Sequence, residues 1–262
     1  MVMTLFSGEK PIIAALHLPD FSLTRELPQS WFEDYAVTNA RVFARAGIPW
    51  IKLQDQTKAV GCATPDTVAR MAAIARIVRS EVPGPKLGII VEAHDPITAL
   101  SVASASGAEF VRLKVFVGGA MSAQGPRSGI GAEAVVHRAD INCPNIALLA
   151  DVHDRTVVPI SGETQPFAAE WAAKTGADGL VVTGRSFPDT LNRLVAVRSA
   201  GVRLPILIGG GVTSTNVAEA LSASDGVVVS SALMRRNVEL VDLLHWDPDL
   251  CSRFMEAARM PA

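Results

Sequence analysis

The stretch PILIGGGVTSTNVAEALSASDGVVVSSAL, residues 205–233, reads as one complete strand–helix–strand unit. An apolar strand ends in three glycines, a Thr/Ser-rich segment opens a helix that Thr213 or Ser214 can cap, and an Asp-Gly turn leads into a second apolar strand. Glycines let a ligand approach the backbone, and free N–H groups at a helix N-terminus favour an anion such as phosphate. A plain strand-to-helix turn explains the glycines equally well. The predicted phosphate-binding residues are Gly209, Gly210, Gly211, Ser230 and Ser231.

Short, β-branched apolar runs recur before this stretch, and each is followed by a segment with helical spacing. The expected strands are 11–18, 50–55, 86–93, 110–116, 146–153 and 179–184, followed by the two strands within 205–233. The expected helices are 31–46, 64–82, 96–106, 132–139, 165–175 and 189–200, one within 205–233, and two in the tail at 238–244 and 249–258. Strands that are apolar throughout belong to a parallel sheet covered on both faces, and eight of them close a TIM barrel.

The sequence therefore predicts an α/β protein with a single (β/α)8 barrel domain over residues 1–262. The barrel is expected at about 11–244, with a C-terminal helical tail at about 245–262. The Gly-rich segment 118–131 is the longest loop between units, and loops of this length are usually functional or mobile.

Composition excludes several classes of protein. Apolar residues make up 49% of the 262 residues, charged residues 19%, and the net charge is −2, which argues against a nucleic-acid partner. Three cysteines without CxxC spacing indicate neither a disulfide framework nor a zinc site. Neither a signal peptide nor a membrane span is predicted, so we expect a soluble cytoplasmic protein.

Polar side chains stand near one end of nearly every expected strand. Side chains of a barrel strand alternate between lumen and helix layer, and the active site lies at the carboxyl ends of the strands. Polar groups converging there are costly to bury unless they pair with one another or face a wet pocket, and the pocket is the preferred interpretation. The ring consists of His17, Lys52, Gln54, Glu92, His94, Arg112, Lys114, Asp151, His153, Thr183 and Ser230.

Within this ring, Glu92 and Asp151 are the candidate general acid/base pair, and Lys52 or Lys114 the cation for an anionic substrate or intermediate. A desolvated lysine could instead form a Schiff base, although pairing with a carboxylate is the commoner role of such a lysine. The expected substrate-binding residues are His17, Gln54, Arg112, His153 and Thr183.

No resident cofactor is expected, and a divalent metal remains an alternative. Residues i and i+2 of a strand project to the same side, so Glu92 with His94 and Asp151 with His153 could supply mixed ligands. The strand between these two pairs separates them. His137 and His245 are expected to be surface or packing residues.

The chain resembles the BtpA family from Pro11 to Met234. The residues that carry the resemblance are His17-Leu18-Pro19, Leu149-Ala150-Asp151-Val152-His153, Gly176-Ala177-Asp178, Thr183-Gly184, Gly211-Val212-Thr213, Asn216-Val217, Asp225-Gly226 and Ser231. The resemblance implies a TIM barrel of the ribulose-phosphate-binding type. It implies less about activity, since the family is named for a member linked to photosystem I biogenesis and has relatives in sugar-uptake settings.

The sequence departs from the family pattern around the mouth. The departures are Asp20-Phe21-Ser22, Lys52-Leu53-Gln54-Asp55, Ala93-His94-Asp95, Lys114 and Ser230. We therefore expect mouth chemistry that differs from that of the named member, with the phosphate end better kept.

Three functions remain open. The first is an enzyme that isomerises, cleaves by an aldol reaction or lyses a glycosidic bond in a small phosphorylated metabolite. The second is a non-enzymatic assembly or biogenesis factor, and the third is a metal-dependent nucleosidase or hydrolase. A homo-oligomer is suggested by fold-level analogy alone.

Overall fold

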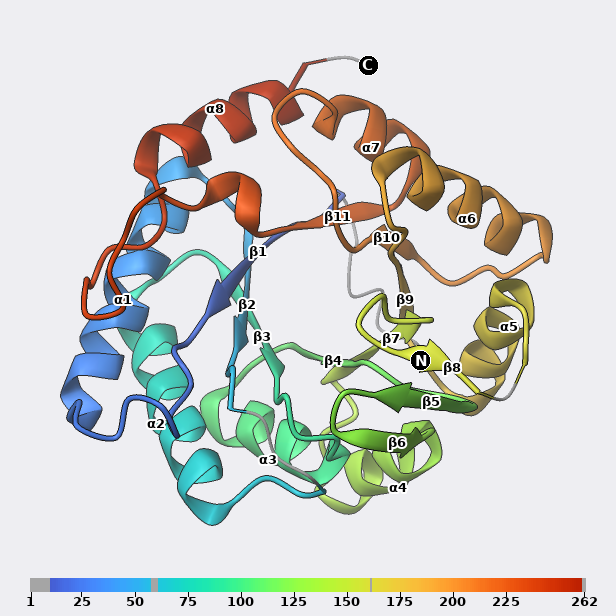
Figure 1. Ribbon diagram of the computed structural model, residues 1–262, viewed down its shortest axis with the longest axis horizontal. Coiled ribbons are helices and arrows are strands. Elements are labelled where there is room, and N and C mark those ends of the chain that lie inside the picture. Colours follow the sequence, from blue (N-terminus) through green and yellow to red (C-terminus); the bar gives the residue numbers. More distant parts are fainter. Residues whose placement is uncertain (1–9, 58–60, 161, 261–262) are drawn as a thin grey trace.

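The computed structural model describes residues 10–57, 61–160 and 162–260 of the chain. Eight parallel strands form a closed barrel in the order β1-β11-β10-β9-β7-β4-β3-β2, and Figure 1 shows the helices surrounding it. This is the predicted α/β barrel. The barrel strands are β1 (Ile12–His17), β2 (Trp50–Gln54), β3 (Lys86–Ile90), β4 (Phe110–Leu113), β7 (Ala147–Val152), β9 (Gly179–Val182), β10 (Ile206–Ile208) and β11 (Gly226–Val229).

Eight helices and one short 3-10 turn accompany these strands in the described part of the chain. They are α1 (Gln29–Ala46), α2 (Pro65–Glu81), α3 (Pro96–Ser106), α4 (Gly131–Asp140), α5 (Gln165–Thr175), α6 (Phe187–Ser199), α7 (Val217–Ala223), η1 (Ser231–Leu233) and α8 (Pro248–Ala258). A proline stands in the first turn of α2, α3, α5, α6 and α8. Proline suits this position because its missing N–H would have no intrahelical partner there.

Capping side chains define where several of these helices begin. Thr64, Asp95, Ser186 and Asp247 each accept a hydrogen bond from a backbone N–H in the first turn. Such caps satisfy amide groups that the helix itself leaves unpaired. The helix starts are therefore encoded locally, close to where the sequence places them.

An apolar plug fills the barrel lumen. It consists of Ile13, Trp50, Phe110, Ala147, Leu149, Val181, Leu207 and Val228, all inward-facing and buried. A separate and larger core lies between the outer face of the barrel and the helices. The register pairs Ile13 with Trp50 and Ala15 with Lys52, so the next inward layer lies two residues closer to the carboxyl ends and is largely polar.

A second, antiparallel sheet replaces the expected loop 118–131. Strands β5 (Gly119–Ser122) and β6 (Gly125–Ser128) form a hairpin, and β8 (Val158–Pro159) pairs with β5. Figure 1 shows this small sheet beside β4 and β7. It therefore links the segments that follow two adjacent barrel strands.

The predicted helix at 238–244 is wrong. Glu239 and Asp242 form a turn, in which Asp242 N donates to the Glu239 carbonyl over 3.1 Å. The following backbone is held from elsewhere in the fold, because the buried side chain of Asn39 donates to the Leu243 carbonyl and accepts from the His245 amide. Tertiary hydrogen bonds have replaced the helical ones, and Leu240 is exposed.

The plug generates a prediction at Gly88, whose missing side chain makes room for Phe110. A Cβ on Gly88 would lie 2.0 Å from Phe110 Cζ, and the Phe110 ring is fully buried. Gly88→Ala should therefore destabilise the protein by about 1–3 kcal/mol through overpacking, measured by denaturant unfolding.

The matched control combines Gly88→Ala with Phe110→Leu. If the ring causes the strain, the double variant should lose less stability than the sum of the two single changes, with a coupling above roughly 0.5 kcal/mol. Additive losses would contradict the proposed contact.

Candidate active site

A cavity of about 300 Å³ opens at the carboxyl ends of the barrel strands. Its volume is at the lower end of the range for small-molecule sites, roughly 300–1,000 Å³. Most of the predicted ring lines it. The lining residues that the sequence identified are His17, Lys52, Gln54, Arg112, Lys114, Thr183, Gly209, Gly210, Gly211, Ser230 and Ser231.

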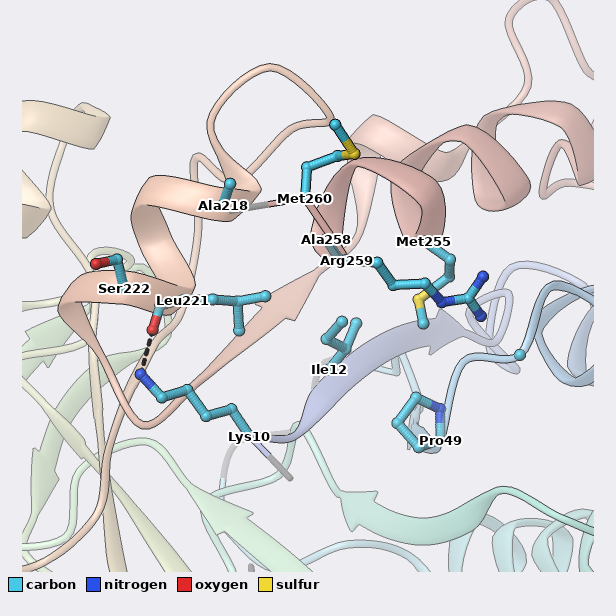
Figure 2. A pocket seen from close by; sticks show the side chains of 11 residues that line it. Lys10, Ile12, Pro49, Ala218, Leu221, Ser222, Met255, Ala258, Arg259 and Met260 are labelled. Atoms are coloured by element: carbon cyan, nitrogen blue, oxygen red, sulfur yellow. Dashed lines mark hydrogen bonds between the residues drawn. The ribbon is translucent and has the colours of Figure 1, made fainter. Parts of the chain in front are cut away.

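A larger cavity of about 600 Å³ lies at the opposite end of the barrel (Figure 2). One wall of this cavity comes from Lys10, which precedes β1, and from Ile12, which begins it. The other wall comes from α7 and α8, and the Lys10 ammonium donates a hydrogen bond to the Leu221 carbonyl of α7. Catalytic residues of TIM barrels come from the carboxyl ends of the strands, whereas residues at the amino ends of the strands contribute to stability. The smaller cavity is therefore the candidate active site.

A chain of polar contacts crosses one side of the mouth. Lys52 Nζ donates to Gln54 Oε1 over 2.6 Å, and Gln54 Nε2 donates to Glu92 Oε1. Lys114 Nζ completes the chain with a 2.8 Å contact to Glu92. The side chains of Glu92 and Lys114 are 15% and 18% exposed. Lys114 lines the cavity, whereas Glu92 does not line it but contacts two residues that do, Lys114 and Gln54.

Arg112 and Asp151 form a bidentate ion pair deeper in the barrel. Arg112 Nη2 donates to Asp151 Oδ1 over 2.7 Å, and Arg112 Nε lies 3.1 Å from both carboxylate oxygens. Burial raises the pKa of Asp151 to about 6 against the opposing effect of Arg112, and the carboxylate in turn raises the pKa of Arg112. The Asp151 side chain is 1% exposed, so it orients Arg112 and is itself shielded from the cavity.

Lys52 is 4% exposed and lies directly above the apolar plug. Among the residues that the structure describes it forms no ion pair, because Arg112 engages Asp151 and Lys114 engages Glu92. Burial lowers the pKa of Lys52 well below its ordinary value, and the charges of Arg112 and Lys114 lower it further. Burial without an ion-pair partner thus disfavours the charged form of the amine.

His17 stands on the neighbouring strand, in register with Gln54. Burial is the largest of the causes that lower its pKa to about 3. The imidazole is therefore neutral at physiological pH. It can offer a substrate a hydrogen-bond donor or acceptor but no positive charge.

The glycine and serine rim lies on the other side of the cavity. A Cβ on Gly209 would lie 2.1 Å from Thr183 Oγ1, and that buried hydroxyl has no hydrogen-bond partner among the described residues. Arg155 reaches the same rim, since a Cβ on Gly210 would be 3.5 Å from its Nη1. An unpaired hydroxyl, bare backbone and a guanidinium thus meet at one place.

The helix behind this rim begins later than predicted. Thr213 and Ser214 do not cap it; α7 starts at Val217 with Asn216 at the cap position. Asn216 Oδ1 accepts from the Thr213 amide, which bends the intervening residues into a turn. An anion bound at this rim would therefore contact the glycine backbone, the hydroxyl groups and Arg155, and not the N-terminus of α7.

His94 and His153 lie outside the mouth cavity, contrary to the expectation from strand alternation. The His94 ring contacts the Ser128 carbonyl of the hairpin at 2.5 Å. His153 has a positive φ of 54°, which breaks the alternation, and its Nε2 lies 3.5 Å from Glu163. Both rings face the small antiparallel sheet rather than the lumen axis.

The four candidate metal ligands are therefore not gathered at one point. Within residues 10–57, 61–160 and 162–260, no group of three or more His, Cys, Asp or Glu side chains is arranged to hold a metal ion. Glu92 is occupied by Lys114 and Gln54, and Asp151 by Arg112.

Sequence reasoning missed several residues of the site. Asp154, Arg155 and Thr156 line the cavity from the segment after β7, and Lys114 Nζ lies 3.9 Å from Asp154. The signal in the sequence was the run of polar residues that directly follows the expected strand 146–153. Asp55 was also missed; its fully buried carboxylate accepts a hydrogen bond from the Glu92 amide over 2.6 Å and so positions Glu92.

The fold and the site define a (β/α)8 barrel with a polar, ligand-sized cavity at the carboxyl ends of its strands. The model of the BtpA family matches residues 8–260, and the chain belongs to that family.

Two relatives and one solved structure illustrate the range of similar proteins. The photosystem I biogenesis protein BtpA of Synechocystis sp. is 30% identical over 196 residues, which cover 74% of this chain and 67% of the relative. An uncharacterised protein of Pyrococcus horikoshii is 31% identical over 234 residues, covering 86% and 87%. Ligand-free tryptophan synthase from M. tuberculosis superimposes with a TM-score of 0.64 at 13% identity, covering 99% of both chains, which supports the fold alone.

No helix in the described part of the chain combines the length and apolar character that crossing a bilayer requires.

Asp55 generates a prediction about stability and pH. Burial raises its pKa to about 7, and its Oδ2 has no hydrogen-bond partner in the part of the chain that the structure describes. The folded state then binds a proton more tightly than the unfolded state, so this contribution to stability is complete below about pH 4 and is lost as the pH rises through 7. The full loss amounts to at most about 4 kcal/mol.

Asp55→Asn removes this titration. Denaturant unfolding of wild type and variant between pH 4.5 and 8 should show wild-type stability falling relative to the variant as the pH rises. Asp34→Asn, at an exposed position of α1, is the control and should follow the wild-type profile. A constant difference between Asp55→Asn and wild type would contradict the raised pKa.

Proposed function

We propose that this protein is a cytoplasmic enzyme that acts on a small phosphorylated metabolite, a sugar phosphate or related glycosyl compound, by acid/base chemistry at the barrel mouth. The observation that carries the proposal is that the cavity with the glycine and serine rim is also lined by Lys114, which pairs with Glu92 over 2.8 Å. Isomerisation, aldol cleavage and glycosidic-bond lysis of a phosphorylated compound can each use a site that holds the phosphate and a nearby group that transfers a proton.

The rim supports binding of a phosphate group. Bare glycine backbone permits close approach, and the hydroxyls of Thr183, Ser230 and Ser231 are hydrogen-bond donors. Arg155 forms no ion pair among the described residues, so its positive charge is available for an anion. Arginine suits this role because its planar donors match phosphate oxygens.

The opposite wall supports proton transfer. Glu92 is paired with Lys114, which lines the cavity, so we expect this pair to exchange a proton with bound substrate and to stabilise developing negative charge. The sequence suggests Asp151 as a general acid or base, but its surroundings favour a different role. Its bidentate contact with Arg112 and near-complete burial suit a positioning role better than proton transfer.

Ligand binding is tested with a thermal-shift screen of sugar phosphates, since a ligand that binds the folded state raises its melting temperature. Ser231→Asp places a negative charge at the rim and should abolish the shift through repulsion of the phosphate. Ser222→Asp introduces the same charge at the opposite end of the barrel and should leave the shift unchanged. Equal loss in both variants would contradict a phosphate site at this rim.

Catalysis is tested on a substrate that emerges from this screen. Glu92→Gln keeps the shape of the side chain but cannot transfer the proton, so kcat should fall by roughly 10²–10⁴ while phosphate binding persists. Glu256→Gln, on the exposed face of α8, serves as control and should retain wild-type turnover. Full activity in Glu92→Gln would rule out its proposed role.

The name of the Synechocystis relative favours a second candidate, a non-enzymatic assembly factor. The screen separates the two candidates. Stabilisation by a sugar phosphate followed by its conversion supports the enzyme, whereas absence of any phosphorylated ligand together with a stable protein partner supports the assembly factor. A homo-oligomer is compatible with either candidate.

A further inference from the structure

We infer that Lys52 is a covalent nucleophile that forms a Schiff base with the carbonyl group of a phosphorylated aldehyde or ketone held in the mouth cavity. The inference rests on the proposed function, because it relies on phosphate binding at the rim. It narrows the substrate class to carbonyl compounds. It is carried by where Lys52 lies, what surrounds it and what it contacts.

The surroundings of Lys52 set it apart from the other lysine of the mouth. Lys114 is held against Glu92 at 2.8 Å as the ion-pair partner of that carboxylate. Lys52 has an apolar layer beneath it, and its neighbours in register on the two adjacent strands are the small residues Ala15 and Gly88. The amine is thus desolvated, and burial together with two nearby cations lowers its pKa. A lysine is activated as a nucleophile by this combination of features.

The contacts of Lys52 leave the amine ready to react. A neutral amine has two N–H groups and one lone pair. One N–H donates to Gln54 Oε1 over 2.6 Å, which fixes the direction of the nitrogen, and Gln54 in turn donates to Glu92. The lone pair is available for a carbonyl carbon in the cavity that Lys52 lines together with the phosphate rim.

The neighbouring residues can supply the protons that the step requires. The lone pair of Lys52 forms a bond to the carbonyl carbon as the C=O π bond breaks, and the oxygen takes a proton from the Lys114–Glu92 pair to give a carbinolamine. The nitrogen, which is positively charged after the attack, returns one proton to the Lys114–Glu92 pair and so regains its lone pair. A second proton transfer to the carbinolamine oxygen lets the C–O bond break and water leave, while the nitrogen lone pair forms the C=N bond of the iminium. The amine, the carbonyl compound and one proton thus become the iminium and one water, without oxidation or reduction.

The test is reductive trapping on the full-length protein. Dihydroxyacetone phosphate is added with sodium borohydride, and intact mass and peptide mapping locate the product. The expected result is one adduct per chain on Lys52, with a mass increase equal to that of the probe less one oxygen. Lys52→Arg should lower labelling at least tenfold, and Lys174→Arg, at an exposed position of α5, should leave it unchanged. Mapping the wild-type protein needs no variant and so does not depend on whether Lys52→Arg folds.

Two further probes separate this inference from the proposed function. Glycerol 3-phosphate has no carbonyl group and reports the phosphate grip by thermal shift, while dihydroxyacetone lacks the phosphate and reports the amine. A thermal shift without an adduct on Lys52, or with adducts on other lysines, overturns the Schiff-base inference and retains the phosphate site. An adduct on Lys52 that forms equally well with dihydroxyacetone retains the nucleophile and overturns the phosphate grip. Absence of both the shift and the adduct overturns both.

Discussion

The alternation of side chains along eight closed parallel strands is the constraint on which this structure depends. Every second residue of a strand must enter a lumen of limited width, and the register of the strands places those residues in layers. Here one layer is an apolar plug around Trp50 and Phe110, and the layer above it contains Lys52, Arg112 and Thr183. The plug excludes water from beneath the polar layer. This exclusion makes the charges of the mouth interact strongly with one another.

The cations and anions of the mouth are unequally matched. Asp151 compensates Arg112 and Glu92 compensates Lys114, which leaves Lys52 and Arg155 without an ion-pair partner among the described residues. The consequences differ because the two lie in different surroundings. Lys52 is buried above the apolar plug, which lowers its pKa, whereas Arg155 retains its charge beside the glycine rim. One unmatched group therefore suits nucleophilic chemistry and the other suits anion binding.

Much of the fold and part of the site could be predicted from the sequence because they depend on local periodicity. A few neighbouring residues are enough to identify the apolar runs and the capping residues. They also predict, by alternation along the strand, that Lys52 and Arg112 face inward. Parity fails once a strand has ended, which is why His94 and His153 lie elsewhere.

The remaining features depend on contacts between distant parts of the chain. The Asn39 side chain contacts the backbone of Leu243 and His245, about 200 residues further along the chain. These contacts take the place of the helical hydrogen bonds expected at 238–244. Arg155 reaches the rim from a segment whose course follows from pairing between β8 and β5. Periodicity within a single element contains no information about such pairings.

The small antiparallel sheet ties together the segments that follow β4 and β7, and His94 adds the segment after β3 through the Ser128 carbonyl. Three consecutive sectors of the rim are thereby fastened into one wall. This wall cannot part in the middle without breaking the pairing of β5 with β6 and β8. The two sides of the mouth are consequently built differently, with a paired wall after β3, β4 and β7 and short glycine and serine turns after β10 and β11.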